Sequence, residues 1–169
     1  MNRVNRSTPK KEQLIADLAD ARDAVLMAAA GLRADEQDVA FLGTWSAHDI
    51  VAHLIGWDRA NLEAIESVRQ GQLPGFYAHY DPDWRTFNAG LVAQHKQRTM
   101  AETLAVAQAS HQALLAALAN LPGEDVVRDY GVRSPRRRRV TIAMLLTTEA
   151  RDEQKHAEQI RAFAGRGAG

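Results

Sequence analysis

Apolar residues recur along much of the chain at steps of three and four, the spacing that lines up side chains on one face of an α-helix. Four stretches follow this pattern: Thr8 to Gly31, Ser46 to Gly71, Asp81 to Pro122 and Thr141 to Gly165. Each opens with a residue type that caps helix N-termini, and each ends near glycine or proline. The pattern predicts an all-α protein, an up-and-down four-helix bundle with one longer crossover connection.

The helical pattern stops between Glu124 and Val140. Val126 and Val127 have β-type side chains, and we expect an extended segment or a small hairpin here. A chain of 169 residues is most simply one domain, so a single bundle should span residues 1–169. The ends, residues 1–7 and 165–169, are expected to be loose tails.

Composition narrows the choice of function. The 21 Lys and Arg residues balance 21 Asp and Glu residues, which gives no overall attraction to nucleic acid or an anionic membrane. The absence of cysteine excludes disulfides and thiolate metal sites. No apolar run approaches the roughly 20 residues of a membrane span, and the polar N-terminus lacks a secretory signal. We therefore expect a cytoplasmic protein with no nucleic-acid or membrane partner.

The last helical stretch carries acids and a histidine in the middle of its apolar face. At steps of three and four, this face comprises Ile142, Leu145, Glu149, Asp152, His156, Ile160 and Phe163. Since both ends are apolar, we expect the middle to face the core as well. Buried ionisable groups are costly unless they are paired, hydrogen-bonded or bound to a metal. The cluster is therefore the first candidate for a functional site.

The spacing within this cluster suits a metal site. Asp152 and His156 stand four residues apart, so both could reach one cation from a single helix, and His53 on the second helix could supply a third ligand. Two imidazoles and a carboxylate are ligands for zinc, nickel or ferrous iron. Glu149, one turn earlier, would orient a ligand or act as a base. The alternative interpretation is a surface ion pair and a core histidine.

Two segments, residues 43–58 and 149–160, resemble the DinB-like family of four-helix bundles, which includes the N-terminal domain of mycothiol-dependent maleylpyruvate isomerase. The resemblance implies a bundle that pairs as a homodimer. It also implies a divalent metal, held by one His on the second helix and a His-x-x-x-His pair on the fourth. His53 matches the first ligand, and His156 with Gln159 matches the last. Asp152 replaces the other histidine, which alters the site without removing it.

Residues 80–88 resemble a second branch of the family, related to colibactin self-protection proteins, whose members are thought to act on an electrophile without a metal. By this resemblance Trp84 and Asn88 would approach the same cavity mouth as Trp57 and contact substrate. The alternative is that Trp84 packs in the core and Asn88 lies at its rim.

A run of four arginines, Arg136 to Arg139, is the strongest local charge in the chain. It could neutralise phosphates, or it could belong to a solvated loop. The favoured function is a metal-dependent enzyme acting on a small molecule with a low-molecular-weight thiol, as a transferase, isomerase or hydrolase. The alternatives are a metal-free bundle that binds or detoxifies a small molecule, and a non-catalytic stress-response dimer.

Overall fold

The structure is a computed structural model that describes residues 10–166, except for the side chains of residues 80–82. Its helices are α1 (Lys11–Ala30), α2 (Ala47–Arg69), α3 (Tyr77–His95), α4 (Met100–Ala119), α5 (Gly123–Val127) and α6 (Ile142–Arg166). Residues 10–166 contain no β-sheet, only isolated bridges between Leu42 and Trp45 and between Arg133 and Arg139. The predicted start of the first helix at Thr8 lies outside the described residues.

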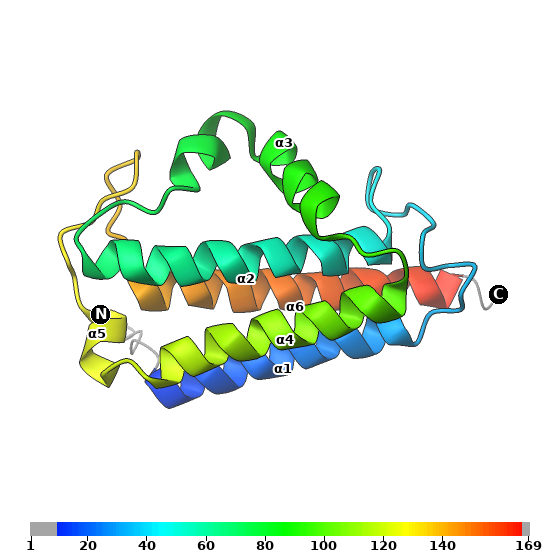
Figure 1. Cartoon of the computed structure of the whole chain (residues 1–169), viewed down its shortest axis with the longest axis horizontal. Helices are drawn as coiled ribbons and strands as arrows, with labels where there is room; N and C mark the ends of the chain where they lie inside the picture. The colour runs from blue at the N-terminus through cyan, green and yellow to red at the C-terminus, as the bar shows by residue number, and fades with distance from the viewer. Residues whose placement is uncertain (1–9, 167–169) are drawn as a thin grey trace, which may run out of the picture.

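Helices α1, α2, α4 and α6 form a four-helix bundle (Figure 1). Helix α1 packs on α4 and α6, and α2 packs on α4. Helix α3 arches over α2 and carries the chain back along the bundle, so α4 runs in the same direction as α2 (Figure 1). The all-helical bundle with one long crossover is therefore confirmed. None of the described helices is both long and apolar enough to cross a lipid bilayer.

The prediction of one long third helix is wrong, because two helices, α3 and α4, occupy that stretch. The chain leaves α3 after His95 and starts α4 at Met100. Thr99 caps α4 by accepting a hydrogen bond from the backbone N–H of Glu102, whose side chain in turn accepts one from the backbone of Thr99. This capping box begins a new helix without glycine or proline.

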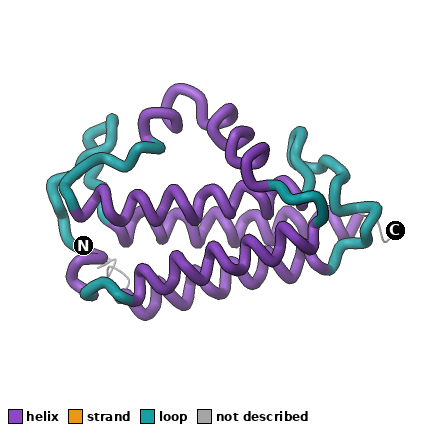
Figure 2. The backbone as a smooth tube through the Cα atoms, in the orientation of Figure 1, coloured by secondary structure: helices purple, strands orange, loops and turns teal. Residues whose placement is uncertain are grey.

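Helix α3 is itself bent, as the two helical pieces at the top of Figure 2 show. The backbone at Asp83 is extended, with φ of −158°, and its carboxylate accepts a hydrogen bond from the N–H of Thr86. Asp83 therefore caps the second piece, whereas the side chain of Asp81, the predicted cap, lies outside the described part of the structure. The caps predicted for α2 and α6 are confirmed: Ser46 forms a capping box with Asp49, and Thr141 accepts from the N–H of Met144.

The segment between α4 and α6 differs in part from the prediction. Val126 and Val127 belong to the short helix α5, so the extended structure expected there is wrong. A small hairpin forms further on, where the N–H of Val140 donates to the carbonyl of Val132. The arginine run lies at the exposed tip of this hairpin.

The apolar core consists of two clusters. One contains Leu18, Leu114 and Ile142, and the other contains Val25 and Ile55. On each of α1, α2 and α6, a buried charged residue stands between the residues that belong to one cluster and those that belong to the other.

The buried face of α6 is not the predicted one in its middle turn. Glu149 is buried as expected, but Asp152 is exposed and Glu153 is fully buried instead. Asp152 lies instead on an adjoining side of the helix, which lines a cavity together with residues of α3.

Gly56 allows α3 to approach α2. A Cβ atom at this position would lie 2.8 Å from Cβ and Cδ2 of Leu91, whereas one at Gly90 would meet nothing within 4 Å. We expect Gly56→Ala to lower the free energy of unfolding by about 1–3 kcal/mol through overpacking. Gly90→Ala, the matched control in a helix, should raise it by about 0.5–1 kcal/mol. Urea denaturation of both variants measures this, and equal effects would contradict the close approach.

Candidate functional site

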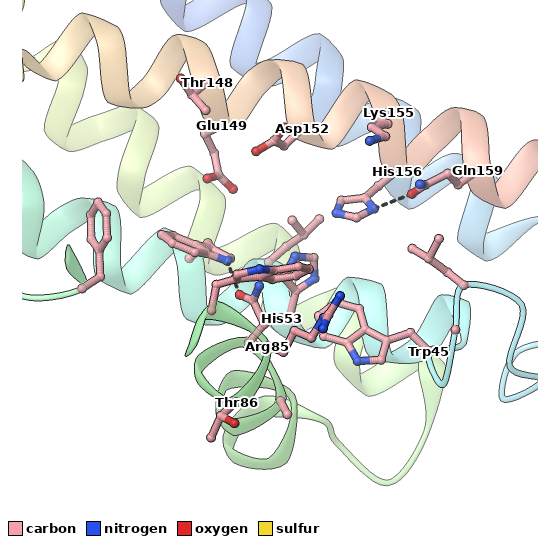
Figure 3. A pocket seen from close by; sticks show the side chains of 18 of the residues that line it. Trp45, His53, Arg85, Thr86, Thr148, Glu149, Asp152, Lys155, His156 and Gln159 are labelled. Carbon is pink, nitrogen blue, oxygen red and sulfur yellow. Dashed lines mark hydrogen bonds between the residues drawn. The ribbon is translucent and has the colours of Figure 1, made fainter. Parts of the chain in front are cut away.

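A cavity of about 990 Å³ lies between α2, α3, α6 and the loop at residues 42–45 (Figure 3). Every tryptophan of the chain lines it, namely Trp45, Trp57 and Trp84. Polar side chains enter from α6, including Glu149, Asp152 and His156. A space of this size and aromatic character suits a small organic molecule.

Two imidazole rings face each other across the cavity. His53 on α2 is buried, and its ring centroid lies 5.1 Å from that of the half-buried His156 on α6, with the rings nearly perpendicular. Nδ1 of His53 donates to the carbonyl of Ile50 at 2.6 Å, and Nδ1 of His156 donates to Oε1 of Gln159 at 2.8 Å. With Nδ1 protonated in both rings, each Nε2 carries a free lone pair.

Both rings are held in the neutral form. Burial lowers the pKa of His53 to about 3, with repulsion from His156 as a further cause. Burial also lowers the pKa of His156, although Gln159 and Asp152 act in the opposite direction. Neutral imidazoles with an anchored Nδ1–H are the form in which histidine ligates a metal.

The spacing of the two rings is compatible with a shared cation. Two imidazoles bound at about 2.1 Å with a tetrahedral angle between them would have centroids roughly 5 Å apart. The distance between His53 and His156 agrees with this value.

Asp152 is less well placed than the two histidines to share a cation. It lines the cavity one turn before His156 and is near enough to influence the pKa of that ring. However, among residues 10–166 its carboxylate does not join both rings in a group of three ligand atoms within 4.8 Å. It would need a rotamer change to share a cation with His53.

Glu149 lies deeper in the cavity. Burial raises the pKa of its carboxyl to about 8, and the negative charges of Glu153 and Asp58 add to this effect, whereas Arg22 and Asn61 oppose it. The side chain therefore holds a proton at neutral pH and can donate a hydrogen bond.

The predicted substrate contacts lie at the cavity, on α2 and α3. Nε1 of Trp57 donates to Oδ1 of the buried Asn88 at 2.9 Å, which joins the two helices. Trp84 lines the outer part of the cavity and is 50% exposed. Its alternative interpretation as a core residue is therefore wrong.

A buried arginine lies behind the cavity. The guanidinium of Arg22 on α1 donates twice to Asp58 of α2 and twice to Glu153 of α6, at 2.8–2.9 Å, and once to the carbonyl of Ala107 on α4. All five of its N–H donors are thus used. Although burial alone would lower it, the pKa of Arg22 is raised by Glu153 and Asp58.

This network also contains a group with metal-site spacing. One ligand atom from each of Asp58, His111 and Glu153 lies within 4.8 Å of the others, and all three residues are buried. By spacing alone they could share one cation. In the structure the guanidinium of Arg22 lies against both carboxylates, so a cation would have to displace it.

The sequence contains signals for Arg22, Glu153 and Asn61, because each interrupts the apolar face of its helix. Arg22 follows Leu18 by four residues on the apolar face of α1, and Glu153 follows Glu149 by four on α6. Asn61 fills the gap between Trp57 and Ala64 on the face of α2. A polar residue at such a position is either buried and paired or lines a cavity.

A model of the DinB superfamily matches residues 17–160 of the chain. The chain belongs to the DinB superfamily. The match spans α2 and α4 and most of α1 and α6, and it includes both histidines of the cavity. No curated protein sequence matches the chain.

Solved structures share the fold of this DinB superfamily protein at low identity. The colibactin self-resistance protein ClbS, in complex with double-stranded DNA, has a TM-score of 0.74 and 16% identity over 92% of this chain and 96% of its own. A Streptococcus pneumoniae protein has a TM-score of 0.75 and 13% identity, with 94% and 92% covered. An uncharacterised protein of Clostridium difficile 630 has a TM-score of 0.75 and 10% identity, with 94% and 97% covered.

One of these structures bears on the expected partners. ClbS was crystallised with double-stranded DNA, so at least one protein with this fold binds nucleic acid. This finding argues against excluding nucleic acid on the basis of net charge alone.

Loss of Arg22 should destabilise the bundle strongly. Arg22→Met would leave the buried carboxylates of Asp58 and Glu153 without their cation, and we expect the free energy of unfolding to fall by about 3–5 kcal/mol. Arg33→Met, which removes an exposed pair with Asp35, is the control and should have no measurable effect. Chemical denaturation monitored by circular dichroism measures both, and similar losses would contradict the role of Arg22.

The proton on Glu149 should appear in the pH dependence of stability. The folded pKa of about 8 lies above the ordinary value of 4.5, so this group stabilises the fold below pH 4.5 and loses that effect as the pH rises to 8. Relative to Glu149→Gln, the wild type should lose about 1.4 kcal/mol of unfolding free energy per pH unit in this window. Urea denaturation at several pH values measures the difference. A difference that stays constant with pH would show that Glu149 ionises normally.

Proposed function

We propose that the protein binds a divalent cation through Nε2 of His53 and His156, with Asp152 as a third ligand, and acts on a small molecule in the adjoining cavity. The observation that carries this proposal is the pair of neutral rings 5.1 Å apart, each with Nδ1 anchored and Nε2 free. Zinc, nickel and ferrous iron are the metals that suit such ligands.

A cation in this position would act as a Lewis acid toward a substrate group, such as a thiol or a carbonyl. The surrounding residues have separate roles. Trp57 and Trp84 provide aromatic surface for the substrate, and Asn88 holds Trp57 in place. Glu149 carries a proton at neutral pH and can transfer it to a substrate atom. These features suit a transferase, isomerase or hydrolase that uses a low-molecular-weight thiol. The resemblance to DinB-like bundles adds the proposal that the protein forms a homodimer.

A metal-free function is the second candidate. The protonated Glu149 in an aromatic cavity can supply an acid to a small electrophile without a cation. The similarity of fold to ClbS is compatible with this candidate, and also with association of the protein with DNA. A non-catalytic stress-response dimer is the remaining alternative, and the metal titration below separates these candidates from the first.

We expect zinc or nickel to stabilise tag-free protein that has first been treated with a chelator. At a hundredfold excess over the dissociation constant, the melting temperature should rise by roughly 5–10 °C. His53→Ala and His156→Ala should each abolish the rise, and Asp152→Asn should weaken the affinity. Differential scanning calorimetry and isothermal titration calorimetry measure these effects.

His79→Ala is the matched control for the metal titration. His79 is exposed on α3 and stacks on Phe87, so its loss should leave the stabilisation intact. Equal stabilisation of the wild type and both cavity variants would place the cation elsewhere, and the absence of any stabilisation would favour the metal-free candidate.

A further inference from the structure

A second polar region lies deeper in the same cavity. Asn61 on α2 follows His53 by eight residues, and Glu149 on α6 precedes His156 by seven. At 1.5 Å per residue, both lie roughly 10–12 Å further along their helices than the histidines. Because α2 and α6 run in opposite directions (Figure 1), these displacements point the same way. Asn61 and Glu149 therefore lie near each other, at a place separate from the imidazole pair.

Asn61 has an unused hydrogen-bond donor. The residue is 3% exposed, and among the described residues its Nδ2 is the buried side-chain atom without a hydrogen-bond partner. The amide is close enough to Glu149 to lower the pKa of that carboxyl, but Nδ2 does not reach hydrogen-bonding geometry with it. Leaving a buried donor unpaired costs free energy, and such a group calls for an acceptor that enters the cavity.

Glu149 supplies a second donor beside it. Its protonated carboxyl points into the cavity, as Figure 3 shows. The charged groups that influence it are Glu153, Arg22 and Asp58, and their combined effect favours the neutral acid. The same negative surroundings would disfavour an anionic ligand at this place, because a carboxylate would meet the repulsion that keeps Glu149 protonated.

We propose that Asn61 and Glu149 form a subsite that hydrogen-bonds the carbonyl oxygen of a neutral ligand, such as an amide, ester or ketone. A carbonyl oxygen has two lone pairs, one for the N–H of Asn61 and one for the O–H of Glu149. The apolar part of the ligand would lie against Trp57 and Phe76, whose rings meet edge to face at 5.3 Å and line the cavity. This proposal rests on the proposed function only in assigning the cavity to a small molecule, since the subsite itself needs no cation.

Benzamide and benzoate provide a test, because they have the same shape and differ in charge. Every tryptophan of the chain lines the cavity, so intrinsic fluorescence reports directly on occupancy. Chelator-treated, metal-free protein is titrated with each probe at pH 7. We expect benzamide to bind saturably, and benzoate to bind at least tenfold more weakly.

Variants of Asn61 and Glu149 test whether these two residues bind benzamide. Asn61→Leu and Glu149→Leu should each weaken benzamide binding about tenfold, the effect of one lost hydrogen bond. Glu149→Gln keeps a neutral donor and should stay within about threefold of the wild type. Asn120→Leu and Glu158→Leu, which change exposed residues outside the cavity, are the matched controls and should bind like the wild type.

Three results would overturn the subsite: no saturable binding of benzamide, benzoate binding as tight as that of benzamide, or unchanged benzamide binding in folded Asn61→Leu. The comparison of the two probes uses the wild type alone, so it stands even where a variant fails to fold. The probe titration contains no metal, so its failure would concern the subsite alone. Failure of the cation site would appear instead in the zinc titrations of the wild type and the histidine variants.

Discussion

The five hydrogen bonds of Arg22 are the interaction on which the rest of the structure depends. From α1 the guanidinium binds Asp58 of α2, Glu153 of α6 and the carbonyl of Ala107 on α4, so one side chain contacts all four helices of the bundle. Apolar packing tolerates small shifts of one helix along another, whereas bidentate charge pairs have a fixed geometry. The arginine therefore sets how far α2 and α6 are displaced along each other.

That register determines the cavity. With Asp58 and Glu153 held on one guanidinium, His53 comes opposite His156 toward one end of the helices, and Asn61 comes beside Glu149 toward the other. The network also acts electrostatically, because the negative charge of Glu153, one turn away, adds to burial in raising the pKa of Glu149. A neutral pair of imidazoles and a neutral acid thus share one cavity, although the acid would be ionised in water at pH 7.

Much of the fold and of the candidate site can be predicted from the sequence, and there are physical reasons why the rest cannot. The apolar periodicity and the caps at Ser46 and Thr141 predicted the bundle. The apolar pattern does not show the break before Met100, because a capping box at Thr99 starts α4 without glycine or proline. Asp152 was expected to be buried because the face of α6 was read as one stripe. In fact α6 has two adjoining sides, and the fully buried acid is Glu153. Arg22 stands on the apolar face of α1, but its partners Asp58 and Glu153 are distant in sequence, so the apolar pattern alone does not show that it is buried and paired.

The proposed cation site consists of the two cavity histidines and not of Asp58, His111 and Glu153 behind them. X-ray absorption spectroscopy at the zinc edge of tag-free, zinc-loaded protein tests this most directly, since outer-shell scattering gives the number of imidazole ligands. Binding at the two histidines predicts two imidazoles together with oxygen ligands. A single imidazole, as Asp58, His111 and Glu153 would provide, or no imidazole at all, would contradict it.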